Sequence, residues 1–312
     1  MPTLTLTVGL PGCGKSTWAK EQVKLAKNKT VILNLDDLRS TMVGGNIHDY
    51  SFSKSSEKYI LAQQHAAAAS AVLNGWNIIV ADTNMNPLVF NSWKQYAKDN
   101  GYTFKEQNFF DEFRKGKSFV HEYFAINAYV KQCKTRNIQR HGTVLEEVID
   151  RFADKYMYST IKFPEIEMSD GFRYIIVDID GTIAHMGDKR SPYDESKVDQ
   201  DDPDWTVMNT IHAEYEYDTK RTRIIVMSGR HETCREMTEA WLQEHAFPYH
   251  YLFMRGADDN RGDDVVKYEL YMKHVHGTGK RVSKVFDDRD RVVDMWRKCL
   301  GLKVYQVAYG AF

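Results

Sequence analysis

One short stretch near the beginning of the chain constrains its fold more than any other: Gly-Leu-Pro-Gly-Cys-Gly-Lys-Ser-Thr at positions 9–17. It follows the pattern G-x-x-x-x-G-K-[ST], in which glycines let the backbone wrap around an anion and point successive N–H groups at it. Alternating apolar residues at 4–8 predict a strand before this loop, and 16–26 predict a helix after it. Together they predict a parallel α/β sheet with an anion site at the helix N-terminus.

The residues of this loop have separate predicted roles. The Lys15 ammonium reaches the β- and γ-phosphates of ATP or another nucleoside triphosphate, and the Ser16 hydroxyl is a ligand for Mg²⁺. The backbone of the remaining loop residues surrounds the phosphates. The predicted donor-binding residues of the loop are Gly9, Gly12, Cys13, Gly14, Lys15, Ser16 and Thr17.

A second buried strand at 30–35 leads into Asp36 and Arg39. If a helix begins at Asp36, the two side chains lie three residues apart on one face. This pairing suits a kinase, because a carboxylate can take the proton from an attacking hydroxyl and a guanidinium can hold a neighbouring phosphate. The alternative is structural: Asp36 caps the helix and forms a surface ion pair with Arg39.

A third buried strand at 76–81 places Asp82 at its carboxyl end, the edge at which open parallel sheets bind ligands. Asp82 could orient the magnesium shell or contact the phosphate acceptor, or it could simply form a turn.

Further along, basic residues accumulate at 113–142. Arg136 and Arg140 share a helix face there and are predicted to close over the donor phosphates, Arg140 foremost; the alternative is a solvated helix face.

Another buried strand, predicted at 172–177, runs into Asp178-Ile-Asp180-Gly-Thr. Two carboxylates at a strand end in this pattern indicate phosphoryl transfer through an aspartate. Asp178 can attack phosphorus, and Asp180 can protonate the departing oxygen and then deprotonate water. Both are predicted to lie at a Mg²⁺ ion, since an anionic substrate must approach them. A Ca²⁺ loop would need further acidic residues that the spacing lacks.

Later segments supply what this chemistry still needs. Ser228, Gly229 and Arg230 end a predicted strand and can bind phosphate. Lys267 lies on a predicted helix and can neutralise the transferring group, and Asp287 and Asp288 end another strand and can hold Mg²⁺. Arg190 follows the nucleophile in an irregular loop and is predicted to contact substrate. The acidic run at 199–204 is predicted to be a solvated loop without chemistry.

The composition of the chain limits what it can bind. Its 312 residues are 42% hydrophobic and carry a net charge of −1, so any nucleic-acid site must be a local patch. The length allows two domains with cores. No apolar run is long enough for a membrane span and the N-terminus shows no signal peptide, so we expect a cytoplasmic protein.

The motifs of the second half resemble the haloacid dehalogenase superfamily of phosphatases, and those of the first half resemble P-loop kinases with an Asp-x-x-Arg acceptor motif. In this order the chain resembles the bacteriophage-type polynucleotide 5′-kinase/3′-phosphatases over nearly its whole length. The resemblance includes Asp-Thr-Asn at 82–84 and Asp-Asp-Val-Val-Lys at 263–267.

This resemblance implies roles for the residues. Asp36 would be the general base on a 5′-hydroxyl, Arg39 would hold the acceptor's 3′-phosphate, and Asp82 would assist there. Arg140, with Arg136, would clamp the donor. In the phosphatase, Asp178 would be the nucleophile and Asp180 the acid/base. Asp287 or Asp288 would complete the metal site, and phosphate would be bound by Arg190, Ser228, Arg230 and Lys267.

The resemblance also implies an α/β kinase domain at 1–150, a connection at 151–171 and a Rossmann-like phosphatase domain at 172–312. The substrates would be RNA or DNA ends, including 2′,3′-cyclic phosphates, and the partners a separate ligase and further copies of the chain. A kinase and a phosphatase in one chain make sense if they act on different ends of a strand. A metabolite kinase fused to a small-molecule phosphatase, and a nucleotide-switched binding module, are the alternatives.

Overall fold

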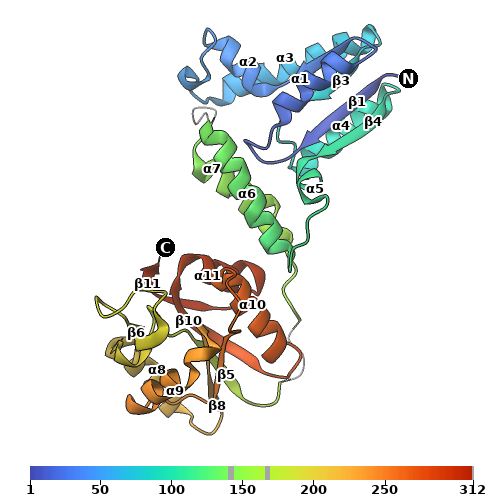
Figure 1. The fold of residues 1–312 in the computed structure, drawn as a ribbon. Helices are drawn as coiled ribbons and strands as arrows, with labels where there is room; N and C mark the ends of the chain where they lie inside the picture. The colour runs from blue at the N-terminus through green and yellow to red at the C-terminus, as the bar shows by residue number, and fades with distance from the viewer. Residues whose placement is uncertain (140–143, 166–168, 311–312) are drawn as a thin grey trace. The chain divides into compact units, whose positions relative to one another are not determined.

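A computed structural model describes residues 1–139, 144–165 and 169–310 of the protein (Figure 1). Contacts between Cα atoms divide the chain into two compact units, Met1–Thr160 and Ile161–Phe312. The division falls within the segment 151–171 that the sequence indicates as a connection. Among the described residues, none of the helices combines the length and apolar character needed to cross a membrane.

The first unit is built on a parallel sheet with the strand order β2-β3-β1-β4. Its strands are β1 (Thr3–Val8), β2 (Thr30–Leu33), β3 (Asn77–Val80) and β4 (Thr103–Asn108). Its α-helices are α1 (Lys15–Leu25), α2 (Leu35–Met42), α3 (Lys54–Leu73), α4 (Pro87–Asp99), α5 (Phe109–Arg114), α6 (Glu122–Gln139) and α7 (Glu146–Tyr156). Short 3-10 turns lie at Ile47–Asp49 and Tyr158–Thr160.

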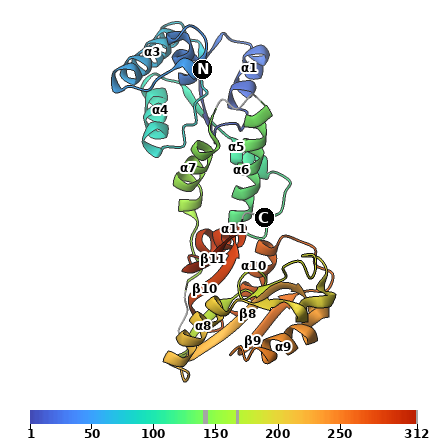
Figure 2. The same cartoon turned by 90° about the vertical axis from the view of Figure 1, so that its left-hand side faces the viewer.

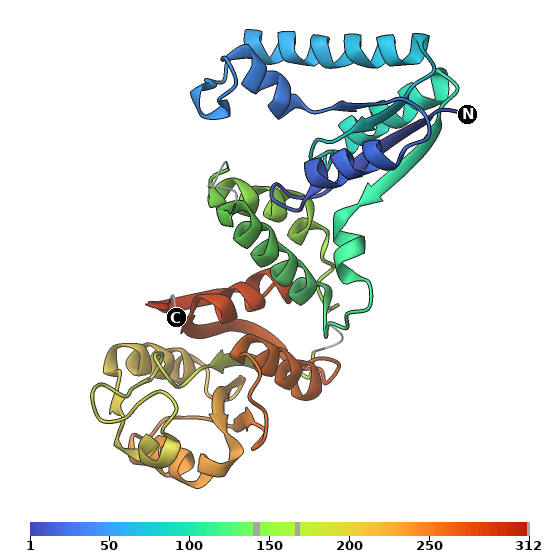
Figure 3. The same cartoon turned by 45° about the horizontal axis from the view of Figure 1, so that its top comes forward.

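Both faces of this sheet are covered by helices. One face packs Leu4, Leu6 and Ile78 against α3 and α4, and the opposite face packs Ile79 against Ala19 of α1. β2 and β3 contain runs of apolar residues, and β1 alternates Thr with Leu and Val, so all three could be predicted from the sequence. Helices α6 and α7 pack beside one another, as the green helices of Figure 3 show.

The second unit is also a parallel sheet, in the order β11-β10-β5-β8-β9, with a small antiparallel pair β6-β7. Its strands are β5 (Arg173–Val177), β6 (Ala184–His185), β7 (Asp202–Pro203), β8 (Thr222–His231), β9 (Tyr251–Arg255), β10 (Arg281–Arg289) and β11 (Val304–Gly310). Its helices are α8 (Trp205–Tyr217), α9 (Arg235–Glu244), α10 (Asp263–His274) and α11 (Asp290–Asp294), with shorter turns at Glu195–Gln200, Glu232–Cys234 and Met295–Cys299.

Helices cover both faces of this sheet too (Figures 1 and 2). Helices α8 and α9 pack on the face that carries Ile175, Val177 and Ile224, with Trp241 fully buried between them and the sheet. Helices α10 and α11 contact β8, β9, β10 and β11. The carboxyl ends of the central strands β10, β5 and β8 therefore meet at one edge, where the motif residues gather. The predicted α/β fold class is confirmed in both units.

Candidate active sites

The phosphate-binding loop of the first unit has the backbone that its glycines predict. Gly12 and Gly14 have φ angles of 81° and 107°, in the left-handed region. A Cβ atom on Gly12 would lie 2.4 Å from the carbonyl oxygen of Cys133 in α6. Helix α6 therefore packs directly on the loop, and only glycine allows that approach.

Lys15 is folded back over its own loop. Its side chain is buried, and Nζ donates hydrogen bonds to the carbonyl oxygens of Gly9 (3.0 Å) and Leu10 (2.7 Å). The first turn of α1 holds no acidic residue, so the positive end of the helix dipole is not offset there. The loop thus presents a cation and a helix N-terminus to a phosphate group.

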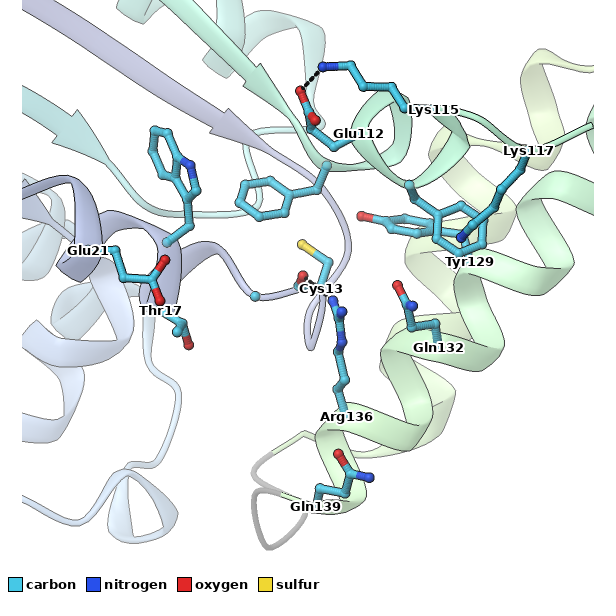
Figure 4. Close-up of a pocket in the computed structure, with 14 residues that line it drawn as sticks. Cys13, Thr17, Glu21, Glu112, Lys115, Lys117, Tyr129, Gln132, Arg136 and Gln139 are labelled. Carbon is cyan, nitrogen blue, oxygen red and sulfur yellow. Dashed lines mark hydrogen bonds and ion pairs between the residues drawn. The ribbon is translucent and has the colours of Figure 1, made fainter.

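A cavity of about 610 Å³ opens beside the loop (Figure 4). Trp18, Phe109 and Phe113 line it with aromatic rings, and α6 contributes polar side chains that include Gln132 and Arg136. Arg136 Nη1 donates a hydrogen bond to the carbonyl oxygen of Cys13 at 2.9 Å. An open cavity of this size that combines aromatic rings with polar and charged side chains suits a nucleotide.

Asn34 connects the loop to helix α2. Its Oδ1 accepts hydrogen bonds from the backbone N–H groups of Asp36 (2.8 Å) and Asp37 (3.4 Å), and its Nδ2 donates to Ser16 Oγ (3.2 Å). Asn34 is thus the N-cap of α2. The alternative prediction that Asp36 caps this helix is wrong, because the helix begins one residue before Asp36.

Asp36 and Arg39 meet on one face of α2, as their spacing predicts. Arg39 bonds to Asp36 Oδ1 at 2.6 Å and to both carboxylate oxygens of Glu57 at 2.8 Å. The bonds to Glu57 are the main reason that the pKa of Arg39 is raised, in spite of partial burial. The Asp36 side chain remains 68% exposed, so its carboxylate is open to an incoming hydroxyl.

In the second unit, three carboxylates converge at the carboxyl edge of the sheet. One oxygen from each of Asp178, Asp287 and Asp288 lies within 4.8 Å of the others. Gly181 stands directly against this group: a Cβ atom there would lie 2.1 Å from Asp288 Oδ2. The glycine of the D-x-D-G-T pattern therefore makes room for the third carboxylate.

One buried lysine partly neutralises these carboxylates. Lys267 is fully buried, and its Nζ lies 2.8 Å from Asp178 Oδ1 and 3.0 Å from Asp287 Oδ2. Burial opposes the charge of the ammonium, but Asp178, Asp263 and Asp287 raise the pKa of Lys267 above its usual value. The lysine is therefore held in its charged form.

The donor set fits a divalent cation. Burial raises the pKa of Asp178 well above its ordinary value against the pull of Lys267, so a further positive charge is needed to keep this carboxylate ionised. Asp178 and Asp287 share the Lys267 ammonium and Asp288 adds a third carboxylate, so the group has an excess of negative charge that a Mg²⁺ ion would offset. Asp178, Asp287 and Asp288 would hold it.

The carboxylate of Asp180 points to a different set of partners. Arg230 donates to both of its oxygens, through Nε at 2.9 Å and Nη2 at 2.8 Å, and Arg190 Nη2 donates to Oδ1 at 2.7 Å. Burial raises the pKa of Asp180, but the two arginines outweigh it and the pKa is lowered. The carboxylate group that could hold a metal is made of Asp178, Asp287 and Asp288, whereas the Asp180 oxygens bond to the two arginines. Metal ligation by Asp180 stays a prediction.

Both units match families of known proteins. Residues 173–312 match the family described as the phosphatase domain of polynucleotide kinase PNKP. This match covers most of the second unit. Residues 4–157, which contain the phosphate-binding loop, match a family described as an AAA domain. The two matches together account for nearly the whole chain, in the order kinase-type domain and then phosphatase domain.

The chain is also similar to individual proteins. A protein of Autographa californica nuclear polyhedrosis virus, whose name describes a bifunctional polynucleotide kinase/RNA ligase, is 28% identical over 311 residues; the match covers 94% of this chain. The chain spans only 41% of the length of that relative. Among solved structures, one of the Pnkp1/Rnl/Hen1 RNA repair complex is similar over 100% of this chain and 97% of its own, with 26% identity and a TM-score of 0.45. An APS kinase, CysC of Mycobacterium tuberculosis, matches 46% of this chain and 76% of its own, with 17% identity and a TM-score of 0.31.

Asp201 is a component of the phosphatase domain that the sequence did not indicate. Its side chain is fully buried, accepting hydrogen bonds from Arg190 at 2.7 and 2.6 Å and from Arg230 at 2.7 Å. The prediction that 199–204 is merely a solvated loop is therefore wrong at this residue. Asp201 bonds to the same two arginines that bond to Asp180. The sequence did not distinguish Asp201 from its acidic neighbours at 199–204.

Asp82 bonds to two neighbouring elements of its unit. Its Oδ1 accepts from the backbone N–H of Leu35 at 2.8 Å and its Oδ2 accepts from Gln64 at 2.7 Å. Burial is the main cause that raises the pKa of Asp82. The carboxylate thus ties the end of β3 to the start of α2 and to α3, and contact of Asp82 with a metal or an acceptor stays a prediction.

Among the remaining predicted site residues, Ser228 and Lys267 are buried, whereas Gly229 lines a cavity. Ser228 is fully buried with its Oγ accepting from the N–H of Arg230 at 3.2 Å, and Lys267 contacts Asp178 from the interior. Contact of either with phosphate therefore stays a prediction. Gly229 lines the cavity of about 830 Å³ that also exposes Asp178, Asp180, Arg190 and Arg230. Arg140 lies outside the described residues.

Proposed function

We propose that this protein repairs polynucleotide ends with two activities. The first unit transfers the γ-phosphate of a nucleoside triphosphate to a 5′-hydroxyl end, and the second removes the phosphate from a 3′ end. The observation that carries the proposal is the group of Asp178, Asp287 and Asp288 around buried Lys267, in a domain of the polynucleotide kinase phosphatase family. RNA and DNA ends are both candidate substrates.

In the kinase reaction, the loop at 9–17, Lys15 and Arg136 bind the phosphates of the donor, as would Arg140. Ser16 would hold Mg²⁺, which supplies charge for the transferred group. Asp36 takes the proton from the 5′-hydroxyl. The oxygen of that hydroxyl bonds to the γ-phosphorus, and the bond from the γ-phosphorus to the leaving diphosphate breaks. The exposed Asp36 carboxylate supports this role. Arg39 binds a phosphate of the acceptor strand.

In the phosphatase reaction, Asp178 attacks the phosphorus and the bond to the 3′-oxygen breaks, giving an aspartyl phosphate and a free 3′-hydroxyl. Asp180 protonates the departing oxygen, then takes a proton from the water that hydrolyses the aspartyl phosphate. Arg190 and Arg230 bind the incoming phosphate. The bonds that Arg190 and Arg230 make to Asp180 support this role. When a phosphate binds the two arginines instead, the Asp180 carboxylate is released and can take up a proton. A 2′,3′-cyclic phosphate would be opened by the same nucleophile.

One oligonucleotide with a 5′-hydroxyl and a 3′-phosphate tests both activities at once. The Lys15→Ala variant is expected to lose 5′ phosphorylation and keep 3′ phosphate release, and the Asp178→Asn variant is expected to do the reverse. Loss of both activities in either folded variant would contradict two independent sites. A preference for free nucleosides over the oligonucleotide would instead indicate a metabolite kinase.

The partners proposed for the protein follow from the same chemistry. A strand with a 5′-phosphate and a 3′-hydroxyl is the substrate of a ligase, and the viral relative combines polynucleotide kinase and RNA ligase in its name. We therefore propose that a separate ligase consumes the product. Assembly into homo-oligomers and a cytoplasmic location stay predictions.

A further inference from the structure

A second groove lies within the phosphatase unit, away from the motif residues. It has a volume of about 670 Å³ and is lined by basic and aromatic side chains that include Arg173, Arg221, Arg281, Lys303, Phe172 and Tyr217. Asp218 is the one acidic residue among the described residues that line it. The groove therefore has an excess of positive charge in a protein whose net charge is −1.

The topology of the sheet explains why these residues gather. Arg173 begins β5 and Arg281 begins β10, and the two are paired in register. Arg221 immediately precedes β8, and its carbonyl oxygen accepts the N–H of Arg173 at 2.7 Å. Neighbouring strands lie about 4.8 Å apart, so the three arginines stand next to one another at the amino edge of the sheet. Asp178 lies at the opposite, carboxyl edge.

The charges in this groove are largely uncompensated. Arg173 pairs with Glu214 at 3.6 Å. Arg221, Arg281 and Lys303 are exposed, and none of them takes part in an ion pair within the part of the chain that the structure describes. An isolated exposed charge needs no partner, but three of them around one groove create a local positive potential.

Aromatic rings accompany these charges. Phe172 lines the groove, and the guanidinium of Arg223 lies over its ring at 4.2 Å. Tyr217 is 85% exposed at the groove wall, although a free ring usually avoids water. A basic groove with rings on which bases can stack is the arrangement that binds single-stranded nucleic acid without sequence preference.

We propose that this groove binds the single-stranded part of the polynucleotide whose 3′ end is processed at Asp178. The inference rests on the proposed function for the class of ligand. The ten residues of β8 span about 33 Å between the two edges of the sheet, and a stacked strand advances about 3.4 Å per nucleotide. An oligomer of a few nucleotides can therefore fill the phosphatase site alone, whereas one of thirty can also reach the groove.

The experiment compares 3′-phosphorylated oligomers of 4 and 30 nucleotides as phosphatase substrates of the full chain. Arg221→Glu/Arg281→Glu reverses two charges in the groove, and Lys94→Glu/Lys273→Glu makes the same change of charge on exposed helical positions elsewhere. We expect the groove variant to raise KM for the 30-mer about tenfold and to leave kcat and the 4-mer unchanged. The slope of log KM against log salt concentration should decrease by about 1.4, because each of the two lost phosphate contacts contributes about 0.7.

Three results would contradict binding of the polynucleotide at the groove and would leave the proposed function unaffected. They are an equal KM for both lengths in the unmodified protein, an equal effect of the two double variants on the 30-mer, and an unchanged salt slope. A groove that instead binds a second copy of the chain or an acidic protein would give the first of these results. Failure of the unmodified protein to release phosphate from either oligomer would refute the proposed function instead.

Discussion

The two candidate active sites of this chain hold their charges in opposite ways. In the phosphatase unit, Lys267 and Asp201 have no exposed side-chain surface, and each is bonded to other charged groups. In the kinase unit, Asp36 is mostly exposed and contacts only Arg39 among the described charged groups. The first site is built into the core of its sheet, and the second is presented on a helix at the surface.

This difference determines what a substitution will cost. Removing one member of a buried charge network leaves its partners without compensation in a poorly polarisable interior, so stability and activity fall together. Removing an exposed carboxylate leaves nothing buried, so only the chemistry is lost. The two sites should therefore separate cleanly when stability and activity are measured on the same variants.

The largest effect is expected for Lys267→Met. Three carboxylates would lose the ammonium that lies between them, and the free energy of unfolding of this unit should fall by about 3–5 kcal/mol, with phosphatase activity abolished. Chemical denaturation and a phosphate-release assay measure the two effects. Lys273→Met, an exposed position on the same helix, is the control and should change neither. A folded, normally stable Lys267→Met protein would remove the contrast between the sites.

Asp36→Asn should show the opposite behaviour. We expect kinase turnover to fall by about 10²–10⁴, the range for loss of a general base, with the melting temperature unchanged. Asp37→Asn, the exposed neighbour on the same helix, should keep its activity. If both substitutions reduce turnover equally, the negative charge at the start of α2 is what matters and Asp36 is not the base.

Asp201→Asn tests whether a residue buried behind the arginines positions them. Misplacing Arg190 and Arg230 by a fraction of an ångström should lower phosphatase kcat/KM by about 10²-fold. Asp201→Glu should restore part of that loss, which a purely structural role would not produce. Asp202→Asn changes the next residue, whose carboxylate pairs with exposed Lys189, and should be silent.

The smallest effect concerns Asn34→Ala. Loss of the N-cap should reduce stability by about 1 kcal/mol, and loss of the bond to Ser16 should lower kinase activity about tenfold. Asn86→Ala removes the corresponding cap of α4 at a similar cost in stability. Because Asn86 has no bond to the phosphate-binding loop among the described contacts, its kinase activity should be normal.

Much of the fold was predictable because several strands have a clear apolar pattern. β3, β5 and β8 contain runs of aliphatic residues, and β1 alternates Thr with Leu and Val. No strand was predicted at β4, since it pairs only with β1 and its sequence Thr-Phe-Lys-Glu-Gln-Asn is largely exposed. An edge strand of this kind has no periodic apolar signal to read.

The catalytic motifs were predictable for a related reason. A phosphate-binding loop, the D-x-D-G-T turn and the Asp287–Asp288 pair each follow a buried strand, so local sequence alone identifies them. Asp201 and Glu57 were not identified. Each contacts its arginine across a long stretch of chain, and each lies in a stretch of charged residues where burial leaves no local trace.

The sequence by itself thus determined the strands β1, β2, β3, β5, β8 and β10 and which side chains stand at their carboxyl ends, because spacing along a strand or helix fixes those positions. Only the tertiary structure decided which charges are buried and which partner each one has. The Asp180 carboxylate bonds to Arg190 and Arg230, and the Asp82 carboxylate bonds to the start of α2. Electrostatic interactions depend on distance and burial in space, and neither is written in the local order of residues.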